Sequence, residues 1–479
     1  MTRRRDFLAA SLRAGAALPA AGLLGRLAEA GSPSLGPALR TASGRPMFPD
    51  PVRHWRGDSS VASALHTAQR PPDVPASPSP PPPGSPTTPA LARRYADLPR
   101  HFIFEYYPWY GTNPYRHWDQ WDRVPPLDLA SHYVPSLGAY DSASAAILER
   151  HARWIADSGI GAVNLSWWGQ GSREDRLVPL IMDVMRDYGL KVTFHLEPYA
   201  DDHVLRVADD ILYLLREYGE KRKWDAFLLL QNADGKSGPL FKGFRTILPE
   251  EVKDCHGVTH RVPDFAPDTL WRRQNLGLRA LLAQDFDHLT LLADSLNFER
   301  TQAGGFDGIA IYDNFVPPSS YAAHGAGASR YELLFSFNVN PGFDAIEPRQ
   351  RDPGDCSSGQ PFSPPAPELD WSRADERERA AALSRQRILE CLSSTLAVQL
   401  DVQLTNAQKG FFLVYVNSFN EWHEGHAFEP MKGDGELSSG ERVWGYHDPA
   451  DGGYRLATLA QALEPLLTPA AQEPRQPSV

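Results

Sequence analysis

Hydrophobic and polar positions beyond residue 93 follow two alternating patterns. Short runs rich in β-branched and aromatic residues predict strands. Between them, apolar positions three and four residues apart predict helices, most clearly over residues 203–219 and 376–400. The predicted strands are residues 102–110, 162–168, 191–198, 225–231, 289–295, 308–314, 333–341 and 411–419.

Strands that alternate with helices over roughly 370 residues predict an α/β protein, a (β/α)8 TIM barrel. We expect one catalytic domain with long loops over residues 93–468 and a disordered tail over 469–479. A doubly wound open sheet is the alternative. No glycine-rich dinucleotide-binding turn follows the first predicted strand, which counts against that alternative.

Charge and cysteine content exclude several classes of protein. The chain of 479 residues carries a net charge of −11, which argues against nucleic acid or an anionic membrane as a partner. No stretch reaches the ~18 uninterrupted apolar residues of a transmembrane segment, and we expect a monomer. The three cysteines lack zinc-type spacing. Cys391 falls in a helical pattern and is expected in the core, whereas a disulfide between Cys255 and Cys356 stays open.

The first residues predict export. Arg4 and Arg5 precede Asp-Phe-Leu in the twin-arginine pattern, and Ala-Glu-Ala at 28–30 is typical of a cleavage site. We therefore expect a signal peptide over 1–30, read by the twin-arginine export machinery of a bacterium, and a periplasmic or secreted protein. Residues 31–92 are rich in proline and predict a disordered linker.

The predicted strands end in aromatic, acidic and amide residues. Their ends read "YYPWYG", "SWWG", "HLEPY", "YDN", "NVNPGF" and "NSFNEWHEG". Active sites of TIM barrels lie at the C-terminal ends of the strands, and aromatic platforms beside carboxylates and amides are typical of a carbohydrate groove. We expect Tyr107, His195, Asn420 and Trp422 to contribute to this groove.

Glu421 and Glu424 stand three residues apart after the last predicted strand. Glycoside cleavage needs a proton donor for the departing oxygen and a second carboxylate, so the pair is the candidate catalytic site. A solvated acidic turn is the ordinary alternative. A zinc motif would need His423 and His426 four residues apart on a helix; they are three apart in a turn, and we expect no metal and no cofactor.

The motifs "YYPWYG", "KVTFHLEPY", "GFDGI" and "SFNEWHEG", in this order, closely resemble glycoside hydrolase family 99, the endo-α-1,2-mannosidases and endo-α-mannanases. The resemblance implies a (β/α)8 barrel that cleaves α-mannosidic linkages with retention. It implies that Glu424 is the general acid/base. Glu421 would be the base acting on the substrate's 2-hydroxyl, giving a 1,2-anhydro sugar. Glu197, Trp168 and Tyr312 match positions that line the sugar subsites.

The sequence departs from the family pattern at some positions. After the catalytic pair the family commonly reads E-G-T-Q-x-E, whereas "EGHAFEP" places His426 and Ala427 there. The stretch after Tyr312 differs as well, and residues 220–243 match weakly. These departures leave the exact linkage and the leaving-group side open.

Two other functions stay open at this stage: a family-99-like protein of surface-polysaccharide biosynthesis, and a non-catalytic glycan-binding protein. Export away from cytoplasmic nucleotide-sugars argues against the first, and retention of both acids argues against the second. Activity on an α-mannan or another mannose-containing oligo- or polysaccharide, lost on changing Glu424, would separate the three.

Overall fold

The computed structural model describes residues 88–200, 202–254, 256–350, 362–366 and 368–467. The predicted signal peptide, the linker up to residue 87 and the C-terminal tail lie outside the described residues, as do Cys255 and Cys356.

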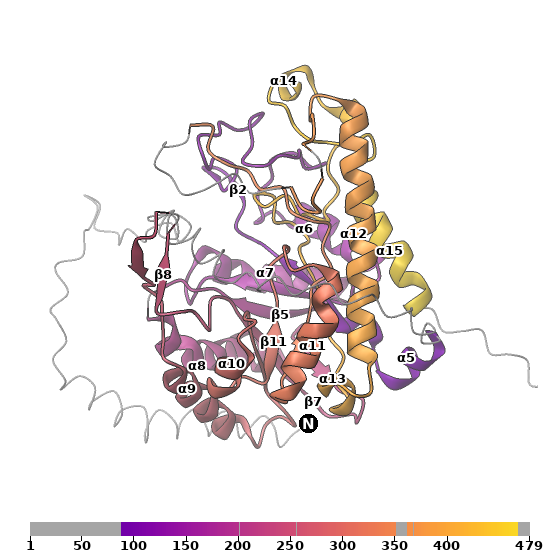
Figure 1. Cartoon of the computed structure of the whole chain (residues 1–479). Helices are drawn as coiled ribbons and strands as arrows, with labels where there is room; N and C mark the ends of the chain where they lie inside the picture. Colours follow the sequence, from indigo (N-terminus) through magenta and orange to yellow (C-terminus); the bar gives the residue numbers. More distant parts are fainter. Residues whose placement is uncertain (1–87, 201, 255, 351–361, 367, 468–479) are drawn as a thin grey trace, which may run out of the picture.

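A parallel barrel forms the centre of the protein, as predicted (Figure 1). Its strands in chain order are β1 (Phe102–Tyr106), β4 (Ala162–Trp167), β5 (Lys191–Leu196), β7 (Ser237–Gly243), β10 (Thr290–Ala293), β11 (Gly308–Ala310), β12 (Leu334–Ser336) and β13 (Val414–Val416). The sheet runs from β12 to β13. A parallel bridge between Val339, just past β12, and Val416 joins these two edges. The Val339 N–H donates to the Tyr415 carbonyl at 2.9 Å, which closes the barrel.

The fourth barrel strand is not the predicted one. The apolar run 225–231 contributes β6 (Leu229–Gln231), which pairs antiparallel with β7 outside the barrel order. β7 reads SGPLFKG, and its glycine, proline and lysine hide the strand pattern. Gly238 is required there, because a Cβ atom would lie 1.7 Å from the carbonyl oxygen of His288.

A helix follows each barrel strand, as a (β/α)8 barrel requires. In order these are α6 (Ala145–Asp157), α7 (Arg173–Asp187), α8 (His203–Leu214), α9 (Asp268–Leu282), α10 (Phe298–Ala303), α11 (Tyr321–Arg330), α12 (Ala374–Leu400) and α15 (Tyr454–Leu467). The helices predicted over 203–219 and 376–400 are confirmed, the first ending in a π-helical turn, η2 (Leu215–Glu220). Cys391 on α12 is fully buried, which confirms its place in the core.

Shorter elements decorate the barrel. They are α5 (Thr88–Arg94), η1 (Leu98–His101), β2 (Gly111–Thr112), β3 (Tyr115–Arg116), β8 (Glu251–Lys253), β9 (Thr259–Arg261), η3 (Pro318–Ser320), α13 (Thr405–Gln408), η4 (Asp434–Glu436) and α14 (Ser439–Arg442). The long helix α12 flanks the loops that carry β2 and α14 (Figure 1). Within the described ranges, no helix combines the length and apolar character needed to cross a membrane.

Alternate residues of each strand face the barrel interior, because side chains on a strand alternate with a period of two. One apolar cluster includes Ile103 of β1, Leu240 of β7 and Leu292 of β10. Two residues further along β1 and β7 come Glu105 and Lys242, which contact each other. The next step along the strands reaches their C-terminal ends, where the candidate site residues lie.

Candidate active site

Below the strand ends, a buried ion pair crosses the barrel interior. The Nζ atom of Lys242 donates to Oε1 of Glu105 at 2.6 Å. Oε2 of Glu105 accepts from Nδ2 of Asn164 at 2.8 Å and lies 3.1 Å from Nδ1 of His195. Burial would raise the pKa of Glu105, but the Lys242 and His195 charges and hydrogen bonds lower it to about 2. His195, predicted to contribute to the groove, is therefore part of this support and is only 1% exposed.

Glu197 and Trp168 are joined through one hydroxyl. The Ser166 hydroxyl donates to Oε1 of Glu197 at 2.8 Å. Oγ of Ser166 also accepts the indole N–H of Trp168 at 3.1 Å. Burial raises the pKa of Glu197. Trp168 is partly exposed, whereas Trp167 beside it is fully buried. The structure thus places a carboxyl and a partly open indole side by side at the ends of β4 and β5.

Two tyrosines, Tyr107 and Tyr312, lie near the acids of the loop, Glu421 and Glu424. The hydroxyl of Tyr312 donates to Oε2 of Glu424 at 2.8 Å. Burial, followed by the charges of Glu424, Tyr107 and Glu421, raises the pKa of Tyr312 well above its usual value. Burial and the charges of nearby glutamates, Glu197 and Glu421 among them, do the same for Tyr107. Both phenols keep their protons and can act as hydrogen-bond donors beside the carboxylates.

Glu421 and Glu424 differ in exposure although they share one loop. Glu421 is 3% exposed, and its Oε1 accepts the backbone N–H of His423 at 2.8 Å. The side chain of Glu424 is 34% exposed, and its Oε2 lies 2.7 Å from Nε2 of His426. One carboxylate is therefore enclosed and the other reaches the open side of the site.

A neighbouring segment holds the loop from behind. The backbone N–H of Asp344 donates to the carbonyl of Glu424 at 2.9 Å. Gly425 has φ +65°, and a Cβ there would lie 2.3 Å from the Asp344 carbonyl oxygen. The guanidinium of buried Arg455 donates to the carbonyls of Gly425 and Ala427. The loop from Glu424 to Ala427 is thus fixed by contacts with its backbone.

Asn420 and Trp422 lie behind the site and do not face a groove. Both are fully buried. The amide of Asn420 pairs with the backbone of Tyr107, accepting from its N–H at 2.8 Å and donating to its carbonyl at 2.9 Å. The indole N–H of Trp422 donates to Glu429 at 3.1 Å. Neither side chain presents an open face for a sugar, which corrects the expectation that they bind substrate.

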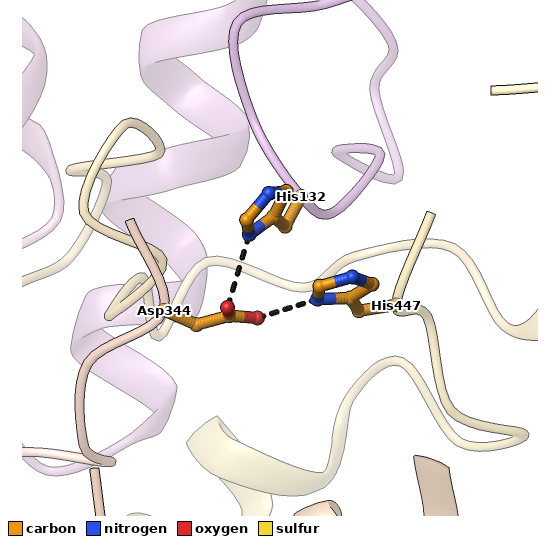
Figure 2. A group of neighbouring side chains, drawn as sticks. All are labelled: His132, Asp344 and His447. Atoms are coloured by element: carbon orange, nitrogen blue, oxygen red, sulfur yellow. Dashed lines mark hydrogen bonds and ion pairs between the residues drawn. The ribbon is translucent and has the colours of Figure 1, made fainter. Parts of the chain in front are cut away.

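Asp344 also lies between two histidines (Figure 2). Nδ1 of His132 is 3.0 Å from its Oδ1, and Nδ1 of His447 is 2.7 Å from its Oδ2. Within the described residues, His132, Asp344 and His447 form the one group of three side chains that could hold a metal ion, since their possible ligand atoms all lie within 4.8 Å of one another. Each nitrogen faces a different carboxylate oxygen, so two donated N–H bonds account for the arrangement.

This histidine–aspartate group has a structural part to play in the site. Burial would raise the pKa of Asp344, but His447 and His132 hold it well below its usual range. The charged carboxylate keeps Asp344 in place, and Asp344 in turn holds the Glu424 carbonyl.

Sequence reasoning missed Lys242, Glu105 and the role of His426. The apolar stretch "PLFKG" contains Lys242, and this lysine could have indicated the ion pair, since a buried lysine needs a paired acid. The sequence showed His426 as part of a rejected zinc motif and as a departure from a family pattern, and neither indicated its contact with Glu424.

Comparison with known proteins identifies similar chains. Residues 97–241 match the model of Glycosyl hydrolase family 99. A glycoprotein endo-alpha-1,2-mannosidase-like protein of Mus musculus is 28% identical over 371 residues, covering 70% of this chain and 70% of that protein. Over these residues the chain is similar to glycosyl hydrolase family 99. It is a glycosidase.

Other family 99 relatives show the same extent of similarity. The glycoprotein endo-alpha-1,2-mannosidase of Mus musculus is 26% identical over 365 residues, covering 68% of this chain and 66% of that protein. The structure of the GH99 endo-alpha-mannosidase of Bacteroides thetaiotaomicron superposes with a TM-score of 0.53 at 21% identity. It covers 77% of this chain and 97% of the solved one, so the family 99 fold extends over most of the described residues.

Proposed function

We propose that the protein hydrolyses α-mannosidic linkages of α-1,2 type in mannan or mannose-containing glycans, with retention of configuration. The observation that carries the proposal is the Glu421–Glu424 loop at the mouth of the barrel, with one carboxylate enclosed and the other 34% exposed. The names of the family 99 relatives supply the mannosidic substrate class.

The first step uses both acids on one sugar. Glu421 takes the proton from the 2-hydroxyl, and that oxygen attacks C1 of the same sugar. The bond from C1 to the leaving oxygen breaks, and Glu424 donates its proton to that oxygen. The product in the site is a 1,2-anhydro sugar.

The second step reverses these roles. Glu424 takes a proton from water, the water oxygen attacks C1, and the bond between C1 and O2 breaks. Glu421 returns its proton to O2. Two inversions at C1 give retention. Trp168 and Glu197 at the ends of β4 and β5 would hold the sugar, and Tyr312 would hold the Glu424 carboxyl.

The test is a screen of α-mannans and α-mannosyl oligosaccharides with product analysis by mass spectrometry. Glu424→Gln should cost ~10²–10⁴-fold in rate on natural glycans and much less on activated aryl glycosides, because a good leaving group needs no proton. Hydrolysis of none of these glycans by the wild-type protein would overturn the substrate class.

The role of Glu421 has a separate test. A substrate with a 2-deoxy or 2-O-methyl sugar and a good leaving group should resist turnover, because O2 cannot attack C1. Proton NMR measures this turnover. Turnover of that substrate, or a sugar ester found on Glu421, would instead indicate an ordinary carboxylate nucleophile.

We also propose export by the twin-arginine route, on the motif at Arg4 and Arg5. Replacing both with lysine should leave the precursor unprocessed in the cytoplasm, measured by fractionation and immunoblotting. Normal processing of the lysine variant would exclude this route.

A further inference from the structure

Each acid of the candidate site has a histidine two residues later. Nδ1 of His423 lies 3.3 Å from Oε1 of Glu421, and Nε2 of His426 lies 2.7 Å from Oε2 of Glu424. His426 is fully buried. It is also one of the two positions at which the sequence departs from the family pattern after the catalytic pair.

The partners of His426 define which ring nitrogen carries its proton. Its Nδ1 atom lies 3.0 Å from Oγ of Ser418. That hydroxyl oxygen accepts the backbone N–H of Glu421 at 2.8 Å, and its own hydrogen can donate to Nδ1. Nε2 then carries the ring proton and donates it to Glu424.

Two donors therefore converge on a single oxygen. Oε2 of Glu424 accepts from Nε2 of His426 at 2.7 Å and from the Tyr312 hydroxyl at 2.8 Å. A carboxyl oxygen that accepts two hydrogen bonds is a poor place for the acid proton, since donors favour the charged form of the oxygen they contact. The proton of the acid form belongs on Oε1.

We propose that His426 is a positioning residue that holds Oε2 of Glu424, so that the proton transferred in catalysis is carried on Oε1. The inference rests on the proposed role of Glu424 as general acid/base. The same chain of hydrogen bonds reaches the backbone of Glu421 through Ser418, so one buried imidazole orders both halves of the catalytic loop.

The first experiment needs no substrate. Protein labelled with ¹⁵N-histidine should show His426 with a protonated Nε2 and an unprotonated Nδ1 at neutral pH, and its signals are assigned by their loss in His426→Gln. In Glu424→Gln the Nε2-bound proton should move upfield, because a charged acceptor has been replaced by a neutral amide. A His426 ring protonated on Nδ1, or a spectrum unchanged by Glu424→Gln, would overturn the inference.

The second experiment compares two replacements at His426 on natural and on activated aryl glycosides. His426→Phe removes the donor and should lower kcat/KM on natural glycans roughly 10- to 100-fold, the effect of losing a hydrogen bond to a charged group. The alkaline limb of its pH profile should move to higher pH. His426→Gln keeps an N–H donor and should retain more activity. Activated aryl glycosides should be affected less by either change.

A purely structural role would give a different result. It would lower the melting temperature and reduce activity on both kinds of substrate equally, with the pH profile unmoved. His324→Phe is the matched control, because His324 is a buried histidine on α11 whose ring packs against Phe298 and Phe337; its pH profile should equal that of the wild type. If the wild type hydrolyses no α-mannoside, the proposed function fails, and the NMR experiment still decides the state of His426.

Discussion

Glu105 and Glu197 are both buried inside the barrel, but their pKa values move in opposite directions. Burial disfavours the charge of each. Glu105 contacts the ammonium of Lys242 and the ring of His195, which lower its pKa to about 2. Glu197 contacts the Ser166 hydroxyl, and burial prevails and raises its pKa.

The difference separates a carboxylate that supports the barrel from one that can serve a substrate. The carboxylate oxygens of Glu105 form hydrogen bonds with three neighbouring side chains, and the group is fully charged at neutral pH. Glu197 lies one step nearer the mouth, beside the partly exposed Trp168. Partners rather than burial decide the role of each acid.

Removing the charge of Lys242 should destabilise the barrel. Lys242→Met keeps an unbranched side chain but leaves the charge of Glu105 unpaired in the barrel. We expect a loss of roughly 3–5 kcal/mol in the free energy of unfolding, measured by urea denaturation with circular dichroism. The double variant Lys242→Met/Glu105→Gln removes both charges and should recover part of this loss. A single variant as stable as the wild type would show that the ion pair does not support the barrel.

Lowering the pH should change the contributions of Glu105 and Glu197 to the free energy of unfolding in opposite directions. The folded-state pKa of Glu105 is lowered from 4.5 to about 2, so its contribution to stability is present above pH 4.5 and lost as the pH falls towards 2. At about 1.4 kcal/mol per unit, this contribution is on the order of 3 kcal/mol. The measurement is the difference in free energy of unfolding between the wild type and the double variant, followed against pH. A difference that does not shrink in acid would contradict the assignment.

Glu197 should show the reverse dependence. Its folded-state pKa is raised, so its contribution is present below pH 4.5 and is lost as the pH rises through the raised value. Glu197→Gln should therefore gain stability relative to the wild type between pH 4.5 and pH 7.

The activity of Glu197→Gln sharpens the same comparison. If Glu197 holds a sugar hydroxyl, the variant should lose about 1.5–3 kcal/mol of transition-state binding, roughly 10- to 100-fold in kcat/KM. Glu174→Gln is the matched control, because burial also raises the pKa of Glu174 and that residue lies on α7. Equal kinetics for both variants and the wild type would remove Glu197 from the sugar site.

Trp168 should give the smallest effect. Trp168→Ala removes the partly open indole and should raise KM roughly 2- to 10-fold, the range for an aromatic contact of about 0.5–1.5 kcal/mol, with little change in melting temperature. Trp167→Ala tests the opposite case, because Trp167 is fully buried and donates to Asp175 at 2.9 Å. Unfolding of Trp168→Ala would identify Trp168 as a core residue.

The amino-acid sequence by itself was enough for the alternation of strands and helices and for the clustering of acids and aromatics at the strand ends. Both follow from periodicities a few residues long, which local sequence expresses directly. The same logic failed at β7, where Gly238 and Lys242 interrupt the apolar pattern because a close backbone approach and a distant acid require them.

Tertiary structure decided which of the clustered residues face the mouth. Asn420 and Trp422 have the composition of groove residues, but contacts with Tyr107 and Glu429 draw them behind the site. The pairing of Glu105 with Lys242, 137 residues away, depends on barrel closure and register. Tyr312, just past the end of β11, reaches Glu424, which lies 112 residues later in the chain. Periodicity places a side chain on one face of its own element; only the packing of elements against one another selects its partner.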